Sequence, residues 1–301
     1  MLLRAGRPLS GRAHDWAVEI KWDGMRLAYS SAGGAWCARS RPGRNCTDDF
    51  PELAGLAEHL ADHAVQLDGE LVVLDGEGRP DFAAVRRRLI GRRSRGAADG
   101  PATFIAFDLL ALDGEELHAV PYRERRAVLG QLLGDGPCWR VPQHWTGDLD
   151  AVVEVTRAHE LEGVVFKRLD SRYEPGRRSG AWLKLKHRRT ETFAITGWAP
   201  ARPNADDMDT FYVARTTADG RLRPAGGVQL GLARGARECL RAELDRRALG
   251  QRRRVINVAA GIEVDVSFHG PPDGPLRDAV MRRLLVEGSD VAPATALPTA
   301  Q

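Results

Sequence analysis

Lysine is rare in this sequence, and its four positions carry the side chains with the most distinctive chemistry. Of the 44 Lys and Arg residues, the lysines are Lys21, Lys167, Lys184 and Lys186, and all lie in or beside predicted apolar strands. An unprotonated lysine amine is a nucleophile, whereas the arginine guanidinium stays protonated. The other positive side chains among the Lys and Arg residues are all arginines, so we interpret these lysines as sites of nucleophilic or phosphate chemistry. The alternative is that lysine occurs at these four positions by chance.

The segment WLKLK places two of these lysines side by side. Residues two apart in a strand share a face, so Lys184 and Lys186 lie together while Leu183 and Leu185 point to the core. Two neighbouring ammonium groups repel each other unless an anion lies against them. The spacing therefore indicates a phosphate site, and a solvated edge strand is the alternative.

Three carboxylates occur beside turns near the lysine-bearing strands. Asp68 and Glu70 in LDGEL share one side of a strand, and Glu162 leads into the strand that contains Lys167. Carboxylates near lysines form ion pairs, or they hold a hard divalent cation that serves phosphates. Each carboxylate alone is explained equally well by a turn or an ion pair. Only the three together indicate a site for a divalent cation.

Strand signals surround these residues. Short alternating runs over 15–75, with a hairpin at Gly33-Gly34, predict a sheet, and ATFIAFDLLAL predicts a buried strand before a turn at Asp113-Gly114. After about residue 189, short alternating strands and one helix over 234–249 predict a small β-barrel of the OB-fold type. Other helices are expected over 51–63, 81–93, 122–133 and 148–161.

Composition narrows the class of protein. No run approaches the roughly 18 apolar residues of a membrane span, and the N-terminus lacks the apolar core of a signal peptide. We therefore expect a cytoplasmic protein that does not enter a membrane. The four cysteines form no CxxC pair, which favours reduced thiols over zinc. A net charge of +3 is compatible with a polyanionic partner without demanding one.

Taken in order, the motifs resemble those of the ATP-dependent DNA ligases, a family of covalent nucleotidyltransferases, and most resemble its compact two-domain bacterial type. The resemblance spans roughly residues 10–288. It rests on KWDGMR from Lys21 to Arg26, SRPGR from Ser40 to Arg44, DGE from Asp68 to Glu70, FDLL from Phe107 to Leu110, EGVVFK from Glu162 to Lys167, and WLKLK from Trp182 to Lys186.

The resemblance implies a fold and a reaction. The fold would be α+β, with an ATP-grasp-like nucleotidyltransferase domain of antiparallel sheets and flanking helices over 1–188, an OB-fold over 189–288, and a disordered tail over 289–301. The amine of Lys21 would attack the α-phosphorus of ATP and expel pyrophosphate. AMP would then pass to the 5′-phosphate of a nick in duplex DNA, and the 3′-hydroxyl would displace AMP and seal the strand.

The resemblance also implies residue roles. Mg²⁺, or alternatively Mn²⁺, would be held by Glu162 and Glu70, the latter near the ribose. Phe107 would stack on the adenine. The other expected nucleotide contacts are Glu19 and Ile20 near the base, Arg26 and Arg41 at the nucleotide or nick phosphate, and Lys184 and Lys186 at the α-phosphate. Arginines expected on DNA phosphates, unless they form only a solvated basic face, are Arg41, Arg44, Arg92 and Arg93.

Two departures from the family pattern affect what we expect. The last motif, PLRDAVMRRLLVEG, has Leu285 where an arginine is expected and no following lysine, so self-adenylation would be slow or Arg282 or Arg283 would substitute. Arg277 completes the set expected to orient pyrophosphate. Only twenty residues precede Lys21. A monomer would therefore grip DNA with its two domains, or with a Ku-like or primase-like repair partner at the bacterial nucleoid.

Two other functions stay open at this point. An RNA ligase or a capping-type guanylyltransferase would share the same motifs and would differ in nucleotide or substrate. A catalytically weak module that binds DNA ends would explain the altered last motif. The repair pathway, whether end joining or excision repair, does not follow from the sequence.

Overall fold

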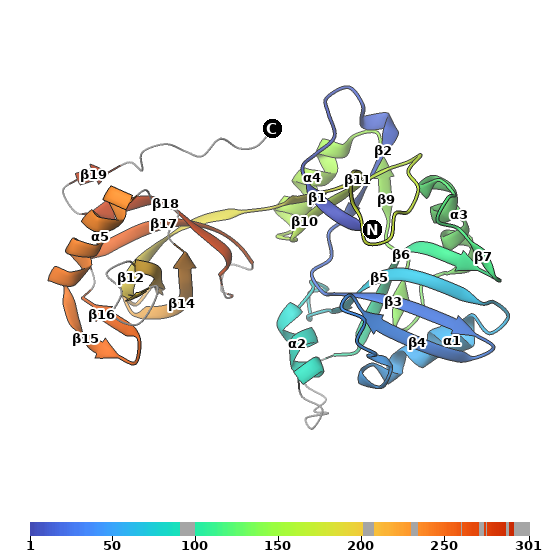
Figure 1. The fold of residues 1–301 in the computed structure, drawn as a ribbon, viewed down its shortest axis with the longest axis horizontal. Helices are drawn as coiled ribbons and strands as arrows, with labels where there is room; N and C mark the ends of the chain where they lie inside the picture. Colours follow the sequence, from blue (N-terminus) through green and yellow to red (C-terminus); the bar gives the residue numbers. More distant parts are fainter. Residues whose placement is uncertain are drawn as a thin grey trace. The chain divides into compact units, whose positions relative to one another are not determined.

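The computed structural model describes residues 1–90, 100–200, 208–229, 234–259, 261–270, 274, 276–286 and 289–291 (Figure 1). The chain divides into two compact units, Met1–Lys186 and His187–Gln301. Within the described residues, no helix is long and apolar enough to cross a membrane.

The first sheet of the unit Met1–Lys186 carries all four lysines or their immediate neighbours. Its strand order is β1-β11-β10-β2-β9, with bounds Leu2–Ala5, Arg178–Lys186, Gly163–Arg168, Trp16–Ile20 and His144–Thr146. Helix α4 (Leu149–Ala158) covers one face, where Val18, Phe166 and Leu183 form a core with its Leu149 and Val153. The alternate residues of these strands face the other way and build the site.

The second sheet of this unit has the order β4-β3-β5-β6-β7, with bounds Ala35–Ser40, Met25–Ala32, Val65–Val73, Ala102–Leu112 and Glu115–Glu116. The short strand β8 (Trp139–Arg140) pairs with β6. Its helices are α1 (Ala54–His59), α2 (Phe82–Ile90) and α3 (Tyr122–Leu132), and three 3₁₀ turns span Ala13–Asp15, Thr47–Asp49 and Pro51–Leu53. Lys167 of β10 donates a hydrogen bond to the carbonyl oxygen of Phe107 in β6 at 3.0 Å, so the two sheets meet at the site.

Turn chemistry at the predicted positions is confirmed. Gly33 and Gly34 join β3 to β4 with φ of 56° and 80°, and Asp113 and Gly114 join β6 to β7 with φ of 50° and 90°. Such left-handed pairs suit the twist of two-residue hairpins. The Asp81 carboxylate accepts a hydrogen bond from the amide of Ala84 at 3.0 Å and so caps α2.

The unit His187–Gln301 is a five-stranded barrel with additions. Strands β12 (Arg189–Pro200), β13 (Met208–Thr216), β14 (Leu222–Gln229), β18 (Arg277–Val286) and β17 (Ile262–His269) form a closed ring, because β13 also pairs with β12. Helix α5 (Arg234–Arg246) follows β14, which completes the arrangement of an OB-fold. The predicted fold class is confirmed.

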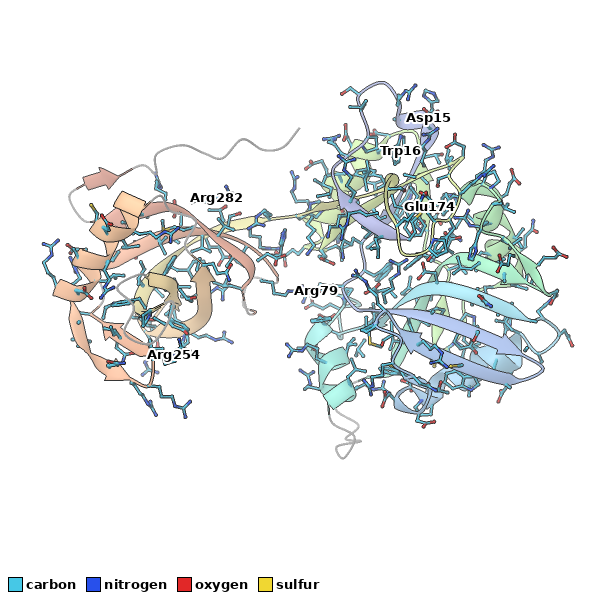
Figure 2. All side chains as sticks on the ribbon, in the orientation of Figure 1. Asp15, Trp16, Arg79, Glu174, Arg254 and Arg282 are labelled. Atoms are coloured by element: carbon cyan, nitrogen blue, oxygen red, sulfur yellow. The ribbon has the colours of Figure 1, made fainter. Side chains whose placement is uncertain are left out.

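Two features of this unit differ from expectation. The helix expected to reach residue 249 ends at Arg246, and the chain turns into a hairpin of β15 (Ala248–Arg252) and β16 (Val255–Val258), with exposed Arg254 at its turn (Figure 2). The segment expected to be a disordered tail begins with β19 (Ser289–Val291), because its backbone extends the sheet beside β18. Residues 292–301 lie outside the described residues.

Candidate active site

Lys21 lies at the end of β2, where its side chain meets a carboxylate from the neighbouring strand connection. Its backbone amide donates to the carbonyl oxygen of Gly163 at 2.9 Å, which ties it to the start of β10. Its Nζ lies 2.5 Å from Oε2 of Glu162, and Nζ of Lys186 lies 3.1 Å from Oε1 of the same carboxylate. Glu162 therefore bridges two of the four lysines.

Glycine at position 163 makes this approach of β10 to β11 feasible. Gly163 has a φ of 149°, and a Cβ there would lie 2.0 Å from the carbonyl oxygen of Leu185. Its register partner is Lys186. Any larger residue would push the start of β10, which follows Glu162, away from Lys186 in β11, so the glycine is a condition for the bridge.

Lys184 lies on the same face, and the arrangement favours an anion beside it. It pairs in register with Val165, which pairs in turn with Glu19 across the sheet. Burial lowers the pKa of the Lys184 amine, and the charges of Lys186 and Lys21 lower it further. A phosphate group would relieve this repulsion.

The second sheet contributes a carboxylate and a guanidinium. Arg26 of β3 and Glu70 of β5 are register partners. Arg26 donates two hydrogen bonds to Asp68, with Nε–Oδ1 and Nη2–Oδ2 distances of 3.0 and 2.6 Å, and the Tyr173 hydroxyl donates to Asp68 at 2.8 Å. Burial raises the pKa of the Glu70 carboxyl to about 8, although Lys21 and Arg26 oppose the shift. An incoming cation would favour release of that proton.

A cavity joins the two sets of residues. Its lining includes Ile20 and Trp22, which flank Lys21, and the side chains Glu19, Lys21, Arg26, Glu70, Phe107 and Trp182. The Phe107 and Trp182 rings meet edge to face, with centroids 6.0 Å apart. A planar base can contact such rings while its phosphates reach the lysines.

The predicted metal ligands come from opposite sides of this site. Glu70 belongs to β5 and Glu162 precedes β10, and both act on Lys21 or contact it. Among the described residues, no group of three or more His, Cys, Asp and Glu is placed to hold a metal ion. Two carboxylates without a third still fit Mg²⁺, which commonly combines one or two carboxylates with substrate phosphates and water.

Other predicted residues lie elsewhere. Arg41 is exposed in the turn after β4, and Arg44 pairs with Asp49 at 2.5 Å. Arg92 and Arg93 lie outside the described residues. The remaining three, Arg277, Arg282 and Arg283, belong to β18 of the barrel unit, where Arg283 pairs with Asp265 at 3.0 Å (Figure 2 labels Arg282).

Sequence reasoning missed two buried ion pairs next to the site. Lys167 pairs with Glu19 at 2.9 Å, and Arg125 of α3 pairs with Asp108 of β6 at 2.8 Å. The rarity of lysine was a signal for the first pair. The second had no usable signal, because an arginine on a predicted helix is ordinarily exposed.

Replacing Arg125 with Met should destabilise the unit Met1–Lys186 by about 3–5 kcal/mol, because Asp108 would stay buried without a counter-charge. Both side chains are 0% exposed. Urea unfolding followed by tryptophan fluorescence measures this, since six of the seven tryptophans belong to that unit. As a control, Arg168→Met breaks the exposed pair with Asp170 and should cost less than about 1 kcal/mol. Equal losses would contradict the assignment.

Comparisons with known proteins point to one family. The family model for the ATP dependent DNA ligase domain matches residues 9–186. The multifunctional non-homologous end joining protein LigD of Mycobacterium bovis is 41% identical over 233 residues, which cover 77% of this chain and 30% of that protein. DNA ligase C2 of Mycolicibacterium smegmatis is 36% identical over 218 residues, or 70% of this chain and 60% of that protein.

Solved structures give the same result. The crystal structure of the ligase domain of M. tuberculosis LigD is 33% identical, with a TM-score of 0.59, and the match covers 98% of this chain and 97% of that one. A mycobacterial DNA ligase D complexed with ATP and MES is 34% identical, with a TM-score of 0.59 and coverage of 96% and 95%. The chain thus spans about a third of the LigD relatives but nearly all of their separately solved ligase domain.

Proposed function

This chain belongs to the ATP-dependent DNA ligase family, and from that premise we propose that it seals nicks in duplex DNA through AMP bound to Lys21. The observation that carries the proposal is the bridge from Lys21 through Glu162 to Lys186, beside the cavity that Glu70 and Phe107 line. In this proposal the amine of Lys21 lies between the aromatic rings that would contact the base and the charges that would bind the phosphates.

The first chemical step follows from these positions. With the base against Phe107, Nζ of Lys21 forms a bond to the α-phosphorus while the bond to pyrophosphate breaks. Nζ gives up one proton before it attacks, and we assign the Glu162 carboxylate, at 2.5 Å, as its acceptor. A second proton leaves Nζ as the phosphoramide bond forms, and water or the departing pyrophosphate takes it. Lys184 and Lys186 offset the charge that builds on the α-phosphate oxygens.

We assign a divalent cation to the two carboxylates of the site. Mg²⁺, or Mn²⁺ in its place, would be held by Glu70 and Glu162 together with phosphate oxygens, and would supply positive charge against the triphosphate. Arg26, held in place by two hydrogen bonds to Asp68, would position the nucleotide.

The second and third steps act on DNA. AMP leaves Lys21 for the 5′-phosphate of the nick, and the 3′-hydroxyl then displaces AMP as the phosphodiester forms. We assign phosphate contacts to Arg41 and Arg44, which are exposed next to β4. The LigD relatives are named for non-homologous end joining. Repair of broken ends, at the bacterial nucleoid and with Ku-like or primase-like partners, is the context that we propose.

Two assays test the proposed function. The intact mass of the purified chain should rise by one AMP with ATP and Mg²⁺, and pyrophosphate should reverse the rise. A labelled nicked duplex should be converted to a sealed strand. Label from GTP but not ATP would instead indicate a capping-type enzyme, and sealing only of RNA would indicate an RNA ligase.

A specific observation supports a second candidate, a weakly catalytic module that binds DNA ends. Leu285 occupies a position of β18 where an arginine is expected, and its register partner is Glu263. If the chain binds nicked DNA but forms no adduct with ATP, this second function replaces the first.

A further inference from the structure

Lys167 is a buried cation that the proposed chemistry does not use. It is 1% exposed and lies among three aromatic rings, with its Nζ 4.5 Å from the Phe107 centroid, 4.5 Å from Trp182 and 4.9 Å from Tyr122. Its Nζ donates to the carbonyl oxygen of Phe107 at 3.0 Å and lies 2.9 Å from Oε1 of Glu19. Removing an ammonium group from water has a large desolvation free energy. We therefore looked for a functional role that would explain the burial of Lys167.

The partner of Lys167 is held in one orientation. Glu19 of β2 is 3% exposed, and its Oε1 accepts hydrogen bonds from both Lys167 and the Tyr122 hydroxyl. Within the described residues, we find no hydrogen-bond donor to Oε2. Glu19 also lines the cavity together with Phe107 and Trp182. One carboxylate oxygen is therefore fixed by protein donors, and the other is available to a ligand.

This arrangement suits a base that presents a hydrogen-bond donor. An ionised carboxylate oxygen is an acceptor only, so it favours an exocyclic amine and disfavours a carbonyl oxygen at the same place. Resting on the proposed function, we infer that Lys167 is a positioning residue for nucleobase selection, which acts by holding Glu19 so that Oε2 accepts from the 6-amino group of adenine.

A neutral residue at position 167 should reverse this effect. Without Lys167, the buried Glu19 carboxylate loses its counter-charge and one of the two donors that hold Oε1, so its orientation is no longer fixed. A carboxyl group that can rotate no longer presents Oε2 at one place, so its preference for an amine at that place is lost. Burial lowers the pKa of Lys167, and the charges of Glu19 and Asp108 oppose that shift, so the positive charge of Lys167 depends on these two carboxylates.

The experiment compares AMP with purine riboside 5′-monophosphate, which lacks the 6-amino group, by isothermal titration calorimetry. The unmodified chain should bind AMP about 10- to 100-fold more tightly, the range expected for one hydrogen bond to a charged group. In Lys167→Met this ratio should fall to about threefold or less, and in Tyr122→Phe it should fall part of the way. Tyr29→Phe is the matched control and should keep the full ratio, because its buried hydroxyl lies within 3.4 Å of the Leu53 carbonyl oxygen, in the core of the other sheet.

A purely structural role would give a different result. Lys167→Met would then weaken both nucleotides equally and leave the ratio unchanged, which would overturn the inference. Should Lys167→Met not fold, Glu19→Gln/Lys167→Met removes both buried charges. The affinity ratio is then measured in that double variant and in Tyr122→Phe. An unchanged ratio in both variants would also overturn the inference. Neither monophosphate can form an adduct with release of pyrophosphate, so the affinity ratio is measured independently of ligation. A chain that never forms lysyl-AMP would therefore contradict the proposed function and leave this inference to be decided by the ratio.

Discussion

Lys21→Arg should eliminate adduct formation with ATP and lower nick sealing by more than about 10³-fold, the scale of loss seen when an enzymatic nucleophile is removed. Arginine keeps the positive charge and can still pair with Glu162, so the fold should persist. Its guanidinium stays protonated and cannot attack phosphorus. Gel autoradiography with α-labelled ATP measures the adduct, and thermal unfolding checks the fold.

A pre-adenylated nick provides the control for this variant. Such DNA already carries AMP on its 5′-phosphate, so its closure bypasses the lysyl intermediate. Lys21→Arg should therefore seal pre-adenylated DNA far better than it seals an ordinary nick. Equal activity on ordinary nicks with and without the substitution would refute the assignment of Lys21 as the nucleophile.

Glu162→Gln should lower single-turnover sealing by about 10²- to 10³-fold, within the range for loss of a preorganised charged group. Glutamine keeps the shape but carries no charge to hold Lys21 and Lys186, which lie 2.5 and 3.1 Å from the carboxylate. It would also be a weaker ligand for Mg²⁺. Titration of Mg²⁺ should therefore show half-maximal activity at a higher metal concentration.

Glu154→Gln is the matched control for Glu162→Gln. Glu154 lies in α4 with its side chain 66% exposed and pairs with Arg157 at 3.1 Å. Its replacement should leave sealing and the Mg²⁺ requirement unchanged. If Glu162→Gln behaved like Glu154→Gln at every metal concentration, the bridge between the two lysines would have no catalytic role.

Much of the site could be predicted because its residues lie on strands with period two. The spacing in WLKLK places Lys184 and Lys186 on one face, and the structure puts Leu183 and Leu185 with the core of the opposite face. The resemblance supplied Lys21, Glu70 and Glu162, which the structure gathers at one site. Their catalytic roles remain proposals.

The partners in the buried ion pairs could not be predicted, because the pairs depend on contacts between distant parts of the chain. Lys167 and Glu19 meet only because β10 pairs with β2, and Lys167 reaches Phe107 only because β6 of the second sheet lies against β10. Nothing local in Asp108 or Arg125 indicates burial. Tertiary contacts therefore determine the buried ion pairs next to the site. Local spacing, by contrast, determines which face of the strand carries Lys184 and Lys186.

In the barrel unit, alternation predicted short strands and a small barrel, but it did not predict β18 or the hairpin of β15 and β16. The helical spacing before it continues through residue 249, and the polar run QRRR gives no strand signal. The structure places a left-handed residue, Arg253 with φ of 58°, at its turn. A residue other than glycine seldom adopts this left-handed conformation. The geometry of the turn imposes it here, so composition does not predict it.

The most direct test is to locate the AMP by peptide mapping under neutral conditions that preserve a phosphoramide bond. Trypsin cuts after Lys and Arg, and adenylation of Lys21 should block that cut. The expected product is the peptide from Ala13 to Arg26 carrying one AMP, which should vanish when pyrophosphate is added. AMP on any other residue would contradict the account. So would a chain that forms a covalent adduct and seals nicks while its Lys21 stays unmodified and is cut by trypsin.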